Sequence, residues 1–439
     1  MELRREVTVV GGGLAGCEAA YRIAESGVAV KLYEMRPGKM TPAHRTGYLA
    51  ELVCSNSLKS EDPTTAQGLL KEEMRLLGSL LLKCAEECRV PAGSALAVER
   101  DLFAAKVTEM IRAHPLIHVE ETEIRSFPQD GIAIIATGPL TSDSLAESIR
   151  QITGQDNLYF YDAVAPIVTA ESLDYSKIFR GSRYGKGGDD YLNCPMTEEE
   201  YREFYRALVE ADIHEGHPVD RGPFFEGCMP VEVIARRGEE ALCYGPMRPV
   251  GLAGKDGKRI HAVVQLRQED QQGTLYSLVG FQTRLRFKEQ ERVFKMIPGL
   301  EKAEFVRYGV MHRNTYINSP RLLEPTLAFK YRKGIFFAGQ ITGCEGYMES
   351  AATGILAGIN AVRLATGKPL LVLPRTTLIG ALCHYLATAS GERFQPMNAN
   401  FGLLPPLPKK IKNRKERYSA YRERSLADLQ ELITAEGLA

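Results

Sequence analysis

The sequence predicts an α/β fold in which a domain built on a doubly wound parallel sheet is interrupted by a smaller α+β insertion domain. Three observations lead to this prediction. Residues 7–36 read as a strand, a glycine-rich turn, a helix and a second strand, and residues 334–363 read as another strand, turn and helix. Between them the chain carries an acidic helix and several short strand-like runs. We therefore expect residues 1–150 and 306–439 to form the two parts of one domain and residues 151–305 to form the insertion.

The glycine-rich turn is the most specific motif of the chain. A β-branched run at 7–10 leads into Gly11, Gly12, Gly13, Leu14, Ala15 and Gly16, and a second apolar run ends at Glu34. In a Rossmann unit the first glycine of GxGxxG permits the tight turn, the second lets a pyrophosphate approach, and the third lets the helix pack against the strand. The helix N-terminus offers N–H groups to the phosphates. We predict a dinucleotide site here, with Glu34 on the ribose and Arg36 among the binding residues.

Four further elements are expected in the first part of the chain. The apolar positions predict one amphipathic helix over 66–88 and another over 100–114. Short alternating runs follow at 118–124. Residues 131–138 read as a buried strand that returns to the sheet beside the first strand.

The inserted segment has a different texture. An acidic helix begins at Thr197, with Glu200 three residues later in a capping-box pattern. Strand-like runs are expected after it, at 232–235, 241–244, 261–266 and 274–279. This pattern is typical of an α+β unit.

A second cofactor signature lies near the other end of the chain. A strand at 335–338 leads to Gly339 and Gln340 and then to a long helix rich in alanine and glycine. In flavoproteins of the glutathione-reductase type, the corresponding turn touches the flavin and carries an acid, which Gln340 replaces here. Because NAD alone would not need a second signature, we predict a glutathione-reductase-like FAD-binding domain. Tyr347 follows the turn and could stack on the flavin, stack on a flipped base, or belong to the core.

Composition limits the function classes. The 439 residues include 55 basic and 55 acidic side chains, which argues against a generally basic nucleic-acid protein. Residues 409–424 nevertheless hold eight Lys/Arg against two Glu, either as a solvated helix or as part of a phosphate-binding surface. The start of the sequence lacks a signal-peptide pattern, no apolar run reaches membrane-spanning length, and nine scattered cysteines do not suggest a disulfide framework. A cytoplasmic protein is expected.

Four segments carry a family resemblance that covers essentially the whole chain. FFAGQITGCEGYMESAATGILAGINA at 336–361 and YFYDAVAPIV at 159–168 resemble segments of the tRNA-modifying flavoproteins GidA/MnmG and TrmFO. ELVCSNSLKS at 51–60 and FFEGCMPVEVIARRG at 224–238 resemble the cysteine motifs of the TrmFO family, the folate- and FAD-dependent tRNA (uracil-5-)-methyltransferases. The length of TrmFO-family proteins also fits this chain, whereas GidA is much longer.

This resemblance implies a reaction. The substrate would be the T-loop uridine of tRNA, the carbon would come from 5,10-methylenetetrahydrofolate, and NADH or NADPH would reduce the flavin. No obligate protein partner and no membrane are implied. Two alternatives remain, a GidA-like wobble-uridine modifier working with a GTPase and a plain FAD-dependent oxidoreductase acting on a small molecule.

The reaction requires a thiolate. Carbon-5 of uracil becomes nucleophilic only after addition at carbon-6, which a thiolate performs well, and a folate methylene needs a reductant to become methyl. From the residues alone, Cys54 and Cys228 are each either reactive or structural. The resemblance implies that both act, with Cys228 as the carbon-6 nucleophile and Cys54 near the flavin. Cys84 and Cys88 lack further ligands, so no metal site is expected.

Overall fold

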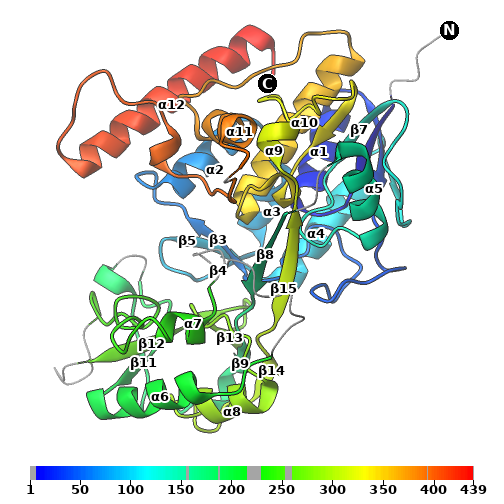
Figure 1. Ribbon diagram of the computed structural model, residues 1–439. Coiled ribbons are helices and arrows are strands. Elements are labelled where there is room, and N and C mark those ends of the chain that lie inside the picture. The colour runs from blue at the N-terminus through cyan, green and yellow to red at the C-terminus, as the bar shows by residue number, and fades with distance from the viewer. Residues whose placement is uncertain are drawn as a thin grey trace.

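A computed structural model describes residues 6–154, 158–185, 188–214, 229–252, 260–392 and 394–438 (Figure 1). Its central feature is a five-stranded, fully parallel sheet in the order β16-β7-β1-β2-β6. The strands are β1 (Glu6–Val10), β2 (Ala29–Tyr33), β6 (Ile117–Glu120), β7 (Ile132–Ile135) and β16 (Ile335–Phe337). β7 pairs with β1 as predicted, and the α/β class is confirmed.

Two helices from opposite ends of the sequence lie together against this sheet. Helix α1 (Leu14–Glu25) follows the glycine-rich turn, and α10 (Tyr347–Ala365) follows the second turn. The contact is close because α10 carries small residues where it crosses α1. A Cβ added at Gly354 would lie 2.2 Å from the carbonyl oxygen of Ala15, and one at Gly358 would lie 2.9 Å from that of Ala19. The two predicted signatures therefore form one packed unit.

The single helix predicted over 66–88 is wrong, because the chain forms two helices there. They are α2 (Ala66–Leu76) and α3 (Leu80–Glu87), separated by Gly78, whose φ is +77°. Ser79 caps α3, and the buried carboxylate of Glu18 accepts hydrogen bonds from the backbone N–H groups of Leu80 and Leu81 at 3.0 and 3.1 Å. The apolar periodicity continues across the break and hides it.

The other helices and strands of the first and last parts of the chain contribute to the main hydrophobic core or to smaller ones. The helix predicted over 100–114 is α4 (Arg100–Ala113). A three-stranded sheet follows the order β3-β5-β4. The remaining bounds are β3 (Ser57–Ser60), β4 (Arg89–Val90), β5 (Ala95–Val98), α5 (Asp143–Thr153), α9 (Ser319–Leu322), α11 (Leu378–Thr388) and α12 (Arg414–Glu436).

A second sheet, antiparallel and six-stranded, lies at the bottom of Figure 1 with its own hydrophobic core. Its order is β10-β11-β12-β13-β9-β14. The strands are β9 (Ile167–Thr169), β10 (Phe179–Arg180), β11 (Leu192–Met196), β12 (Ala262–Gln268), β13 (Leu275–Leu278) and β14 (Phe305–Arg307). Helices α6 (Glu198–Glu210) and α8 (Phe287–Phe294) accompany it, and Thr197 and Glu200 form the predicted capping box.

Two strand predictions in this region are wrong. Residues 232–235 lie in a short helix, α7 (Val231–Ala235), and residues 241–244 lie in turns. The carboxylate of Glu232 is buried and accepts hydrogen bonds from Thr283 Oγ1 at 2.9 Å and from the backbone N–H of Arg284 at 3.2 Å. This polar contact, which no alternation pattern encodes, fixes the helix.

An antiparallel ribbon of β8 (Leu158–Ala163) and β15 (Met311–Tyr316) runs between the two sheets (Figure 1). The division into 1–150, 151–305 and 306–439 remains a prediction. Within the part of the chain that the structure describes, no helix is both long enough and apolar enough to cross a membrane.

Candidate flavin and thiol site

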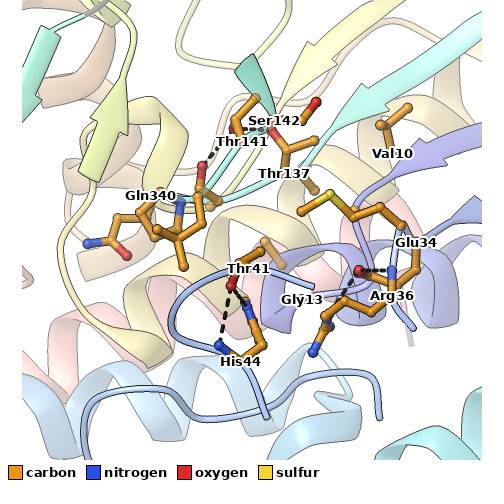
Figure 2. A pocket seen from close by; sticks show the side chains of 18 of the residues that line it. Val10, Gly13, Glu34, Arg36, Thr41, His44, Thr137, Thr141, Ser142 and Gln340 are labelled. Atoms are coloured by element: carbon orange, nitrogen blue, oxygen red, sulfur yellow. Dashed lines mark hydrogen bonds and ion pairs between the residues drawn. The ribbon is translucent and has the colours of Figure 1, made fainter. Parts of the chain in front are cut away.

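The main pocket opens where the two predicted signatures meet, at the carboxyl ends of β1, β2 and β7 (Figure 2). It encloses about 990 Å³ of empty volume, open solvent at its mouth included, which is at the upper end for small-molecule and cofactor sites. The predicted residues that line it are Gly11, Gly13, Leu14, Ala15, Glu34, Arg36, Gly339, Gln340 and Tyr347. Residues 136–142, which the sequence did not indicate as site residues, also line it.

Three glycines of the turn differ in what surrounds the position of a side chain. Gly11 has φ +105°, and a Cβ there would lie 2.5 Å from the carbonyl oxygen of Ala136. A Cβ at Gly16 would lie 1.8 Å from the carbonyl oxygen of Gly11, so this glycine allows the helix to approach the strand. A Cβ at Gly13 would meet no protein atom within 4 Å. Gly13 therefore faces open space in a pocket whose other walls are closely packed.

Glu34 is held in place as a buried carboxylate. Its Oε2 accepts a hydrogen bond from the Gly12 N–H at 2.8 Å, and its Oε1 accepts one from Arg36 Nε at 2.9 Å. Burial raises the pKa of Glu34, but the hydrogen bonds and charge of Arg36 outweigh it and hold the pKa below its ordinary value. The carboxylate is ionised at neutral pH and keeps acceptor capacity toward the pocket.

The second signature closes the pocket from the other side. Gly339 has φ +82° and donates its N–H to Thr353 Oγ1 at 2.7 Å. Gln340 donates its side-chain amide to Glu345 Oε2 at 2.7 Å. Glu345 is buried, and Glu349 is fully buried with Lys59 Nζ 3.0 Å from its Oε1. Neither glutamate lines the main pocket.

Cys54 lies directly beside this pocket through Tyr347, the first residue of α10. The Tyr347 hydroxyl is 3.0 Å from Cys54 Sγ and accepts hydrogen bonds from the N–H groups of Cys54 and Ser55 at 2.9 and 3.1 Å. Burial, followed by the charge of Cys54, raises the pKa of Tyr347 well above its usual range. The phenol therefore stays protonated and can donate its hydrogen to the sulfur.

Residues of the second sheet and its strands hold the Cys54 loop from the other side. Arg307 donates to the Val53 carbonyl at 2.6 Å, and Arg267 donates to Ser55 Oγ and Asn56 Oδ1 at 2.9 and 2.7 Å. Arg100 pairs with Glu269 at 2.8 Å. Sequence reasoning missed these arginines because they are far from Cys54 along the chain and carry no motif.

A second hollow lies on this far side of Cys54. Cys54, Met229 and Arg267 are among its lining residues. Cys228, the predicted carbon-6 nucleophile, lies outside the described residues, and Met229 follows it directly in the sequence. Cys54 thus lines this second hollow, while its neighbours Val53 and Tyr347 line the main pocket.

The remaining described cysteines are buried, whereas Cys54 is only partly buried. Burial raises the pKa of both Cys84 and Cys344 to about 12, which makes these thiols unreactive near neutral pH. Among the described residues, one cluster with metal-ligand types was not foreseen. Ligand atoms of Glu240, Cys243 and His261 lie within 4.8 Å of one another, and no sequence spacing reveals it because His261 is reached only by the fold.

Comparison with known proteins settles the family. A curated relative from Syntrophomonas wolfei, named methylenetetrahydrofolate--tRNA-(uracil-5-)-methyltransferase TrmFO, is 63% identical over 97% of this chain and 98% of its own length. A relative from Moorella thermoacetica with the same name is 58% identical over 96% of this chain and 97% of its own. The chain belongs to the TrmFO family. The chain also matches a wider family: the family model described as "Glucose inhibited division protein A" matches residues 6–369.

Solved structures agree with this fold. GidA from Aquifex aeolicus superposes on the TrmFO-family chain with a TM-score of 0.71, at 17% identity, covering 99% of this chain and 76% of that one. At this identity the likeness concerns the fold alone. It confirms the predicted α/β architecture built on a parallel sheet.

Proposed function

We propose that this chain methylates carbon-5 of the T-loop uridine of tRNA, taking the carbon from 5,10-methylenetetrahydrofolate and the electrons from reduced FAD. The observation that carries the proposal is the near full-length identity, 56 to 63%, to relatives named methylenetetrahydrofolate--tRNA-(uracil-5-)-methyltransferase. The arrangement of Cys54 beside the main pocket supports it. The cytoplasm, where thiols stay reduced, is the compartment that we propose.

The residues of the main pocket fit FAD. Gly13 leaves room for a pyrophosphate, the ionised Glu34 can accept ribose hydroxyls, and Gly339 with Gln340 can meet the flavin end. FAD, when bound, supplies the hydride equivalents that take a methylene to a methyl group. Gly12 and Gly16 support the turn without lining the pocket, while Arg36 fixes Glu34. NADH or NADPH is proposed as the source of electrons.

The two thiols act on the uracil ring in this proposal. We assign Cys228 as the group that adds to carbon-6, which gives carbon-5 enolate character, and that leaves again by elimination. Cys54 works beside the flavin end of the pocket, with the Tyr347 phenol as its hydrogen-bond donor. Cys54 lines the second hollow and contacts Tyr347, which lines the main pocket, so it lies between the cofactor side and the uracil side.

The decisive experiment is reconstitution. Full-length protein, unmodified tRNA, methylenetetrahydrofolate and NADH are incubated, and the nucleosides are analysed for 5-methyluridine. Cys54→Ala and Cys228→Ala should each abolish the product while retaining flavin, whereas Cys84→Ala is the matched control because its thiol is buried in the core. Substantial product from Cys228→Ala would refute that nucleophile. A modified wobble uridine would indicate GidA-like chemistry, and a flavoprotein without tRNA binding would indicate a plain oxidoreductase.

A further inference from the structure

Arg307, the last residue of β14, carries a buried charge that no carboxylate balances within the described ranges. The residue is 7% exposed, and its Nη2 donates to the Val53 carbonyl at 2.6 Å. The neighbouring arginines are placed differently. Arg100 lies 2.8 Å from Glu269, and Arg267 lies 3.9 Å from the same carboxylate.

A buried cation without a counter-charge is costly, so its retention points to an anion that it meets in function. Burial, then the charges of Arg100 and Arg45, lowers the pKa of Arg307 to about 10. The guanidinium therefore still carries its charge at neutral pH. Its anchor point is the peptide directly before Cys54.

Several elements place charged or titratable groups around the Cys54 side chain. α10 contributes Tyr347, which stays neutral. α4 contributes Arg100 at its first position and β14 contributes Arg307, and both guanidinium groups interact electrostatically with Cys54. β12 contributes Arg267, and Glu269 follows that strand. Glu269 offsets only part of the arginine charge, so the described surroundings of Cys54 are electropositive.

We propose that Arg307 is the counter-charge of a Cys54 thiolate and acts as a positioning residue for it. The proposal rests on the proposed function only in taking that thiolate to be used in the reaction. It concerns an acid–base step alone. The sulfur loses its proton to solvent, and nothing is oxidised or reduced. The resulting thiolate accepts a hydrogen bond from the Tyr347 O–H. Arg307 also fixes the loop through Val53, so charge and position come from one side chain.

The test follows alkylation of Cys54 by iodoacetamide as a function of pH in the full-length flavin-loaded protein, measured by mass spectrometry of the Cys54 peptide. An ordinary thiol gives a profile with its midpoint near pH 8.5, whereas the wild type should give a lower midpoint. Arg307→Gln, which keeps a hydrogen-bond donor but loses the charge, should move the midpoint up by about one unit, slowing the reaction roughly tenfold at pH 7. Arg307→Lys should stay close to the wild type.

Arg422→Gln is the matched control, because Arg422 pairs with Glu72 on the α2–α12 contact. Flavin absorbance and melting temperature report folding of each variant. A wild-type midpoint at 8.5 or above, or a folded Arg307→Gln variant with the wild-type midpoint, overturns the proposal. If Arg307→Gln does not fold, the wild-type profile decides alone. The assay contains neither tRNA nor folate, so failure of the proposed function leaves its result unaffected.

Discussion

At the scale of single residues, Gly13 and Gly16 separate cofactor binding from folding. Gly13→Val places a side chain in the open space of the pocket, and Gly16→Ala places one 1.8 Å from the Gly11 carbonyl oxygen. We expect Gly13→Val to purify without flavin while melting close to the flavin-stripped wild type. Gly16→Ala should lose about 1–3 kcal/mol of unfolding free energy, as overpacked sites do. Retention of flavin by Gly13→Val, seen in its absorbance, would contradict the assigned pyrophosphate position.

Tyr347 gives a second residue-scale prediction. Tyr347→Phe removes the oxygen that accepts the N–H groups of Cys54 and Ser55, leaving two donors without their partner. Each unsatisfied group costs on the order of 1–3 kcal/mol when buried, less where water reaches it. We expect the Cys54 loop to become more open to hydrogen exchange and 5-methyluridine formation to fall sharply. Unchanged exchange at 53–57 would show that Tyr347 does not hold this loop.

At the scale of secondary-structure elements, buried carboxylates supplement the ordinary N-caps of helices. Glu73 on α2 accepts hydrogen bonds from the N–H groups of Leu378 and Ile379, at the start of α11, at 2.7 and 2.9 Å. Ser425 Oγ of α12 donates to it at 2.6 Å. Burial raises the pKa of Glu73 to about 7, although these hydrogen bonds lower it. One side chain therefore joins three helices and titrates near neutrality.

This raised pKa predicts a pH dependence. The folded state binds the Glu73 proton more tightly than the unfolded chain, so stability from this group is present below about pH 4.5 and is lost as pH rises through about 7. The difference in free energy of unfolding between the wild type and Glu73→Gln should therefore shrink over this pH window, by at most about 1.4 kcal/mol per pH unit. Denaturant unfolding at several pH values measures it, with Glu72→Gln as control for losing a contact of α2. A constant difference would contradict the prediction.

The same carboxylates mark the limit of predicting elements from sequence. Period and spacing were enough for β1, α1, β2 and the return of β7 to the sheet, since each depends on local apolar pattern and glycine placement. The break at Gly78 and the helix at 231–235 depend on Glu18 and Glu232, whose partners are remote in the chain. A single apolar pattern cannot show such contacts.

At the scale of the whole molecule, some parts of the site could be predicted from the sequence and others could not. The glycines, Glu34 and the second turn could be placed from the sequence because motif and geometry coincide there. Cys54 and Tyr347 could be named, but the arginines near them could not. Arg267 and Arg307 reach the Cys54 loop only when the second sheet docks on the first part of the chain, and Arg100 is brought there by the packing of α4. Cys228 stays a prediction made from its motif.

The basic segment that leads into α12 is the surface that we expect tRNA to contact. The side chains of Lys409, Lys410, Lys412, Arg414 and Lys415 are exposed. Further along α12, Arg422 pairs with Glu72 at 2.7 Å, and Ser425 with Leu429 is buried against the rest of the chain. The helix is thus anchored from Arg422 onward, and Figure 1 shows it along the edge of the molecule beside α2 and α11. Neutralising the five basic residues should leave this anchor intact.

We therefore expect that fivefold variant to bind tRNA more weakly and with a flatter dependence on salt. Each lost phosphate contact should reduce the slope of log affinity against log salt by about 0.7–0.9, because fewer counterions are released. Binding isotherms between low and physiological salt measure both quantities, and neutralising the exposed Lys330 and Lys333 elsewhere shows the effect of lowering the net charge, per charge removed. Flavin content and reduction by NADH should not change, since the pocket lies on other elements. An unchanged slope would show that the segment is a solvated helix and that tRNA docks on another face.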